Sequence, residues 1–130
     1  MIAPVLKNAP VVPYIPASDL ARARRFYEDK VGLVPREQIE GGVVYECGDR
    51  SWIFLYRSGG AGTSKASQAF WQVKDVEKEV AELRAKGVVF EEYDLPGLKT
   101  VNGVATAGNS KAAWFKDSEG NIMAIIQTIA

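Results

Sequence analysis

An internal repeat is the feature of this sequence that most restricts its fold. The stretch VPYIPASDLARARRFYEDKVGL, from Val12 to Leu33, reads as an alternating apolar run, a polar turn, a helix with an apolar face and a glycine. The stretch QAFWQVKDVEKEVAELRAKGVV, from Gln68 to Val89, has the same order when Asp19 is placed on Asp75. Alternation at every second residue predicts a strand, and apolar residues three or four apart predict a helix. The repeat therefore predicts two halves of similar structure.

The two predicted helices have recognisable ends. The first, at about residues 19–30, begins at Ser18 or Asp19, either of which can cap a helix because its side-chain oxygen accepts from a free backbone N–H. The second, at about residues 75–86, begins at Asp75 and ends before Gly87, where a left-handed C-terminal cap is usual.

Three short strand-like runs follow each helix, so that each half reads β-α-β-β-β. The runs are VPREQIE, GGVVYECG and SWIFLYR in the first half, and VVFEEYD, KAAWFK and NIMAIIQ in the second. We expect an α+β fold in one domain, residues 1–130, with module one at about 10–58 and module two at about 66–130. The connection at 94–110 has little periodicity, and ordered loops of this length are often functional, although disorder is the competing interpretation.

Composition excludes several classes of protein. Sixteen basic side chains balance sixteen acidic ones, so no overall positive field exists to attract nucleic acid or an anionic membrane. There is no histidine, which excludes histidine-dependent triads and zinc sites built on imidazole. The single Cys47 forms no internal disulfide and has no basic neighbour in sequence to activate it. The N-terminal residues lack the basic start and long apolar run of a secretion signal, so we expect a cytoplasmic protein. We also expect no membrane-spanning segment, because no apolar run is long enough.

Three segments carry a resemblance to a known family: SDLARARRFYEDKVGL, VKDVEKEVAELRAKGV and WFKDSEGNIM. In this order, with the paired modules, they resemble the vicinal oxygen chelate superfamily, which includes glyoxalase I, extradiol dioxygenases, fosfomycin-modifying enzymes and bleomycin-binding resistance proteins. The resemblance implies an eight-stranded open cup with the helices outside and the ligand site inside. It also implies a homodimer, and it leaves open whether the second module or a partner chain completes the cup.

The resemblance also implies where a metal ion would be bound. The family's usual ligand positions correspond to Val12, Gln68 and Ala124, with a further ligand sometimes at Phe54 or Tyr56. Divalent ions need several charged or strongly basic donors, and one amide among apolar groups does not supply them. We therefore expect no metal and no other cofactor.

Strand alternation predicts what lines the cup instead. If Val12 points inward, so do the alternate residues of its own strand and their counterparts on the neighbouring strands. Several aromatic rings beside two amides suit a small-molecule site, although a strand face of this kind is often only core or a dimer contact. The predicted ligand-binding residues are Tyr14, Trp52, Phe54, Tyr56, Gln68, Phe70, Gln72 and Trp114.

Two functions remain open. In the first, the protein binds a small apolar or aromatic molecule in the cup. In the second, it is a metal-independent or atypical lyase, isomerase or dioxygenase-like enzyme that uses Tyr14, Tyr56, Glu46 or Glu92 as an acid or base. We favour binding, because no pair of residues at a recognisable spacing supplies a nucleophile with its base. Asp117 and Glu119 lie in a predicted turn, where exposed carboxylates without a catalytic role are common.

Overall fold

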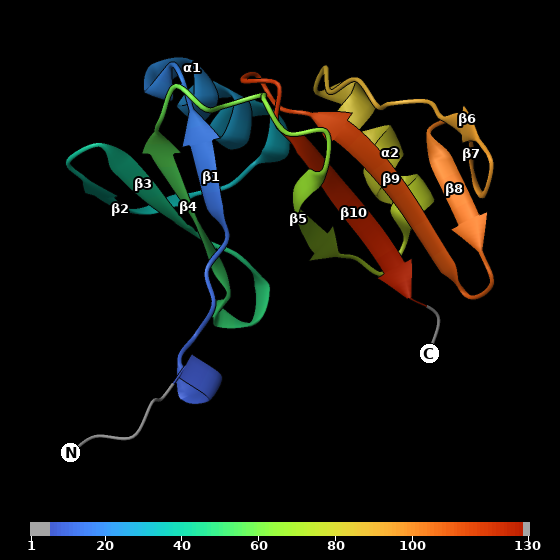
Figure 1. The fold of residues 1–130 in the computed structure, drawn as a ribbon, viewed down its shortest axis with the longest axis horizontal. Coiled ribbons are helices and arrows are strands. Elements are labelled where there is room, and N and C mark those ends of the chain that lie inside the picture. The colour runs from blue at the N-terminus through green and yellow to red at the C-terminus, as the bar shows by residue number, and fades with distance from the viewer. Residues whose placement is uncertain (1–5, 129–130) are drawn as a thin grey trace.

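The computed structural model describes residues 6–128 and contains two open β-sheets (Figure 1). The first sheet has the strand order β1-β4-β3-β2, and its first and last strands in sequence, β1 and β4, run parallel. These strands are β1 (Tyr14–Ala17), β2 (Pro35–Ile39), β3 (Gly42–Glu46) and β4 (Trp52–Arg57).

The second sheet has the order β5-β10-β9-β8-β7-β6, and β5 again runs parallel to the last strand, β10. Its strands are β5 (Ser67–Gln72), β6 (Asp94–Leu95), β7 (Leu98–Val101), β8 (Val104–Ala107), β9 (Ser110–Lys116) and β10 (Ile122–Thr128). The shared pairing of first and last strand confirms the α+β fold class with open sheets. The two sheets hold four and six strands, rather than the expected total of eight.

The helices lie where the sequence predicts them. The first helix consists of α1 (Leu20–Arg25) and a π-helical continuation, η2 (Phe26–Val31), and the second is α2 (Val76–Ala85). Asp19 and Asp75 cap them, each carboxylate accepting from the backbone N–H three residues later. Short 3-10 helices occur at Leu6–Asn8 (η1) and Gly48–Arg50 (η3).

The segment after α2 differs from the prediction. Residues 88–93 form no strand, although Phe90 makes a bridge to Phe115 of β9, and Asp94 begins β6. Residues Ser110–Ala112 of β9 pair with β8, which forms a hairpin with β7 through Asn102 (φ 53°) and Gly103 (φ 81°). Asn-Gly is a strong signal for a two-residue hairpin, because both residues tolerate positive φ. The expected loop at 94–110 therefore contains β6, β7 and β8.

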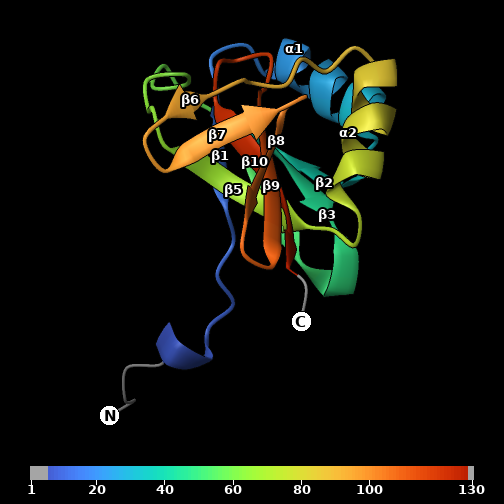
Figure 2. The same cartoon turned by 90° about the vertical axis from the view of Figure 1, so that its right-hand side faces the viewer.

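One hydrophobic core joins the two sheets. It includes Ile15 and Leu55 of the first sheet and Phe115 and Met123 of the second, each 0% exposed. The ring centroids of Phe26, in η2, and Phe115 lie 6.2 Å apart. Figure 2 shows α1 and α2 on the same side of the two sheets. The helix-covered faces thus converge on one core, and the opposite face of each sheet is left uncovered by either helix.

Within residues 6–128, no helix is long and apolar enough to cross a membrane.

Candidate functional site: the uncovered aromatic faces

The predicted alternation holds on the two adjoining strands of the first sheet. Ile15 and Leu55 point into the core, whereas Tyr14 is 61% exposed and Phe54 and Tyr56 are half-buried. Trp52 lies on the same face of β4 and is also half-buried. We call this surface, with Tyr14, Trp52, Phe54 and Tyr56, the first aromatic face.

Three of these rings form a contacting group. The centroids of Tyr14 and Tyr56 are 3.7 Å apart with the rings 25° from parallel, and Tyr14 meets Phe54 edge-on at 5.5 Å. Gly42 of β3 makes room for the Phe54 ring, because a Cβ at Gly42 would lie 2.5 Å from the ring's Cε1. The group is therefore built by close packing within the sheet, and it presents Tyr14 to solvent.

Charged groups flank Trp52 on this face. The Arg36 guanidinium lies 5.5 Å from the centroid of the Trp52 ring, which is a cation–π distance. Glu46 pairs with Trp52 in the β3–β4 register and is exposed. Arg36 was absent from the sequence prediction, since it lies on β2, two strands from Trp52, and the order and register of the strands decide which of their residues meet.

The second sheet presents a similar face. Phe70 is 57% exposed, Gln72 is exposed and Gln68 is half-buried, whereas Trp71, which alternates with them, packs against the core. On β9, Trp114 is half-buried on the same face as Ala112. We call the surface with Gln68, Phe70, Gln72 and Trp114 the second aromatic face.

Two hollows lie along the second aromatic face. Trp114 and Ala112, with Ala105 of β8, line one of about 120 Å³. Phe70 and Gln72 line another, of about 700 Å³, together with residues of the β3–β4 connection. Tyr93 meets Trp114 edge-on at 5.7 Å, a neighbour that the sequence prediction missed. The predicted site residues thus form two groups of four, one on each sheet.

The family's metal positions carry no suitable set of donors. The side chains of Val12 and Ala124 have no atom that could bind a metal ion. Ala124 is also 1% exposed and lies between Phe70 and Trp114 in the strand register. Gln68 donates from Nε2 to the carbonyl of Ala66 at 3.0 Å. Across the part of the chain that the structure describes, no group of three or more Cys, Asp or Glu side chains could hold a metal ion. These positions do not fit a divalent ion.

The proposed acid–base carboxylates have different surroundings. Glu92 accepts hydrogen bonds from the Thr100 hydroxyl at 2.6 Å and the Gly103 N–H at 2.8 Å, and these bonds lower its pKa. Glu92 therefore stabilises the β7–β8 hairpin by hydrogen bonds to β7 and to the turn. Glu46, in contrast, is exposed beside Trp52 on the first aromatic face.

The turn Asp117–Asn121 is buried, and the expectation of exposed carboxylates there is wrong. Asp117 is 5% exposed and accepts from the Tyr27 hydroxyl at 2.5 Å and from the amides of Glu119 and Asn121. Burial, followed by the nearby Asp117 carboxylate, raises the pKa of Tyr27 well above its usual value. Asn121 also donates to the carbonyl of Pro16 at 2.7 Å. The turn thus joins the end of β9 to β1 and the first helix.

The Glu119 side chain also joins this turn to the start of the first helix, by hydrogen bonds and an ion pair. Its carboxylate accepts from the Ser18 hydroxyl, the Asp19 N–H and the Arg22 guanidinium, at 2.8 to 3.0 Å. Burial alone would raise its pKa, but the hydrogen bonds, led by those from Arg22, outweigh burial and lower the pKa to about 2. Asp117, Glu119 and Asn121 are therefore structural, and they fasten the second sheet to the start of the first helix.

Comparison with known proteins identifies the family to which this fold belongs. The family model described as the Glyoxalase/Bleomycin resistance protein/Dioxygenase superfamily matches residues 8–125. No curated protein sequence matches the chain.

Solved structures share the fold at low sequence identity. UcmS2 is 16% identical, with a TM-score of 0.71 over 91% of this chain and 98% of its own. Lactoylglutathione lyase from Agrobacterium tumefaciens is 19% identical, with a TM-score of 0.68 over 92% of each chain. A mutant of the fosfomycin resistance protein FosX from Listeria monocytogenes, complexed with Mn(II) and a dihydroxypropylphosphonic acid, is 14% identical, with a TM-score of 0.64 over 96% of this chain and 90% of its own. The family match over nearly the whole chain, on a fold these proteins share, shows that the chain belongs to the glyoxalase/bleomycin resistance protein/dioxygenase superfamily, within the vicinal oxygen chelates.

Proposed function

We propose that the protein binds a small apolar or aromatic molecule against its two aromatic faces. The observation that carries the proposal is the exposure of Tyr14 and Phe70, at 61% and 57%, on the face of each sheet opposite α1 and α2. Exposed apolar surface in a contiguous patch is a usual mark of a binding site. The Tyr14 ring also stacks on the Tyr56 ring, and this contact limits the rotation of the Tyr14 side chain. A ligand would therefore meet a ring that is already positioned.

The residues on these faces favour a flat, weakly charged ligand. Each good ring–ring contact contributes roughly 1 kcal/mol beyond the burial of area, so two or three contacts would support micromolar recognition. Gln68 and Gln72 add amide donors and acceptors that could orient a ligand. Proteins of this superfamily use the corresponding faces as the inside of a cup, which supports the same use here.

We further propose that a second copy of the chain completes the cup. The helix-covered sides of the two sheets share one core, so the two aromatic faces of one chain lie on the other side of their sheets. A homodimer could place the first aromatic face of one chain opposite the second aromatic face of its partner. Light scattering after size-exclusion chromatography tests this, and a monomer at all concentrations in the presence of ligand would contradict it.

The experiment for ligand binding is a thermal-shift and calorimetric screen with planar aromatic compounds. Phe54→Ala and Trp114→Ala each remove a ring from one aromatic face, and we expect both to weaken binding of a hit by about fivefold or more. The matched control is Val89→Ala, which shortens an apolar side chain that is 77% exposed and lies on neither face.

The outcomes separate the two functions that the sequence left open. Hits that bind Phe54→Ala and Trp114→Ala as tightly as the parent protein would mean that the aromatic faces are only structural. Chemical turnover of a bound compound, lost in Glu46→Gln, would support the metal-independent enzyme instead, because Glu46 is the exposed carboxylate on the first aromatic face.

A further inference from the structure

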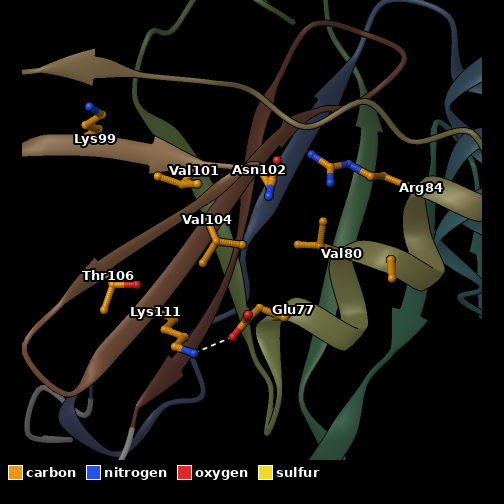
Figure 3. Close-up of a pocket in the computed structure, with 10 residues that line it drawn as sticks. Glu77, Val80, Arg84, Lys99, Val101, Asn102, Val104, Thr106 and Lys111 are labelled. Atoms are coloured by element: carbon orange, nitrogen blue, oxygen red, sulfur yellow. Dashed lines mark hydrogen bonds and ion pairs between the residues drawn. The ribbon is translucent and has the colours of Figure 1, made fainter.

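A third hollow lies on the opposite side of the second sheet from the second aromatic face, and it shares Lys99 and Thr106 with the hollow beside Trp114. It is a groove of about 550 Å³ between α2 and the β7–β8 hairpin, on the helix-covered side of the second sheet (Figure 3). We call it the α2–hairpin groove. Its volume is in the range usual for small-molecule sites. Its lining residues are Glu77, Val80, Ala81, Arg84, Lys99, Val101, Asn102, Val104, Thr106 and Lys111.

The middle of the groove is apolar. Val80 of α2 is 3% exposed and forms part of the core, and Val104 of β8 packs partly against that core. Val101 of β7 is 65% exposed at the side of the groove, which is unusual for a large aliphatic side chain. Figure 3 shows these three valines between the charged groups at the two ends. An apolar ligand body lying here would cover side chains that water now contacts.

The polar groups lie at the ends. At one end, Lys111 and Glu77 form an ion pair and satisfy each other's charge. At the other end, Arg84 and Asn102 point toward one another (Figure 3). No side-chain hydrogen bond from Arg84 occurs within the described residues 6–128, so its guanidinium donors are available.

Arg84 is held in place by its neighbours. Its guanidinium lies 5.7 Å from the centroid of the Phe90 ring. Gly103 leaves space for it, since a Cβ at Gly103 would lie 2.9 Å from Nη2 of Arg84. A guanidinium that is already positioned loses less side-chain entropy on binding a carboxylate than a free one does.

Carboxylates lie near each of the cations that line the groove. Lys111 pairs with Glu77 and also interacts with Asp75, and Lys99 lies opposite Asp94 in the β6–β7 register. Glu92 lies near enough to Arg84 for the two charges to interact. Glu92 is already bound by Thr100 and Gly103, so it does not occupy the donors of Arg84. Arg84 is therefore a cation of the groove whose hydrogen-bond donors are unoccupied among the described residues, and a single guanidinium suits a monoanion.

We propose that the α2–hairpin groove binds a small organic monoanion, whose carboxylate meets Arg84 and whose apolar body lies on the valines. This site is separate from the aromatic faces and does not depend on the function proposed for them. It selects for negative charge and an aliphatic body, whereas the aromatic faces select for flat rings.

Octanoate, titrated by calorimetry and by ¹H–¹⁵N NMR, tests the proposal, with the uncharged octanamide as the matched probe. We expect octanoate to bind with a Kd of about 1 mM or tighter and to shift the amides of α2 and of residues 98–107. Octanamide should bind at least about fivefold more weakly, because it lacks the charge that Arg84 recognises. Arg84→Gln should weaken octanoate binding by a similar factor.

Two variants serve as controls for nonspecific charge and for binding at the aromatic faces. Lys78→Gln removes an exposed positive charge from α2 outside the lining, and Phe54→Ala alters the first aromatic face, so neither should change octanoate binding. The NMR spectrum of Arg84→Gln shows whether it is folded, and Val101→Ser, at an exposed position, provides a second test of the groove. Equal binding of octanoate and octanamide, unchanged binding by folded Arg84→Gln, shifts centred on Tyr14 and Phe70, or no binding at all would each overturn the proposal.

Discussion

Replacing Glu119 by glutamine should destabilise the protein by removing one charge from a contact between distant parts of the chain. The carboxylate side chain is fully inaccessible and accepts two hydrogen bonds from Arg22, ninety-seven residues earlier in the sequence. The amide nitrogen of Glu119→Gln cannot accept from Arg22, and it lies among donors. The variant therefore breaks the fastening of the turn to the first helix while it keeps the size of the side chain.

The magnitude follows from the pKa of Glu119 and the exposure of its partner. Burial raises this pKa, but the hydrogen bonds from Arg22 and the nearby amide and hydroxyls outweigh burial and lower the pKa from 4.5 to about 2. A shift of that size corresponds to at most ~3.5 kcal/mol. The Arg22 side chain is 48% exposed, so solvent screens part of the interaction. We expect Glu119→Gln to lower the free energy of unfolding by about 2 kcal/mol at pH 7.

Urea unfolding followed by circular dichroism, from pH 7 to pH 2, measures this loss. A carboxyl with a lowered pKa in the folded state stabilises the fold fully above its unfolded pKa, and this contribution disappears as the pH falls through the folded pKa. The gap between the parent protein and Glu119→Gln should therefore be constant above pH 4.5 and close between pH 4.5 and about 2. Glu82→Gln, at an exposed position of α2, is the control. A gap under ~0.5 kcal/mol at pH 7, or one that does not change with pH, would refute the reasoning.

Three further substitutions test the fold by the same urea assay. Tyr27→Phe removes the hydroxyl that donates to buried Asp117 and should cost about 2 kcal/mol; a loss near zero would mean that the bond does not matter. Gly42→Ala places a methyl group against the Phe54 ring and should cost about 1–3 kcal/mol with a changed near-ultraviolet spectrum, and an unchanged spectrum would contradict the packing. Asp75→Ala removes the cap of α2 and should cost about 1 kcal/mol, which Asp75→Ser should largely restore.

The predictions of the helices and of strand alternation on β1 and β4 were accurate. Helix positions followed from caps and apolar spacing, and the alternation on β1 and β4 put Tyr14 and Tyr56 on the exposed side as expected. The segment after α2 was mispredicted because β-branched and aromatic residues at Val88–Asp94 favour a strand as strongly as true strand residues do. In the structure β8 pairs with Ser110–Ala112 of β9, and the segment after α2 meets the same strand through the Phe90–Phe115 bridge without extending into a ladder.

The sequence by itself determined the repeated unit, the α+β class and which side chains share a strand face, because each depends on residues close together in the chain. The tertiary structure decided what those faces meet. It placed both helices on one side of the sheets, buried the turn Asp117–Asn121 against the first helix and left the two aromatic faces uncovered. These outcomes depend on contacts between residues about a hundred positions apart in the chain. A local sequence pattern does not predict such contacts, because it describes only residues that are close together in the chain.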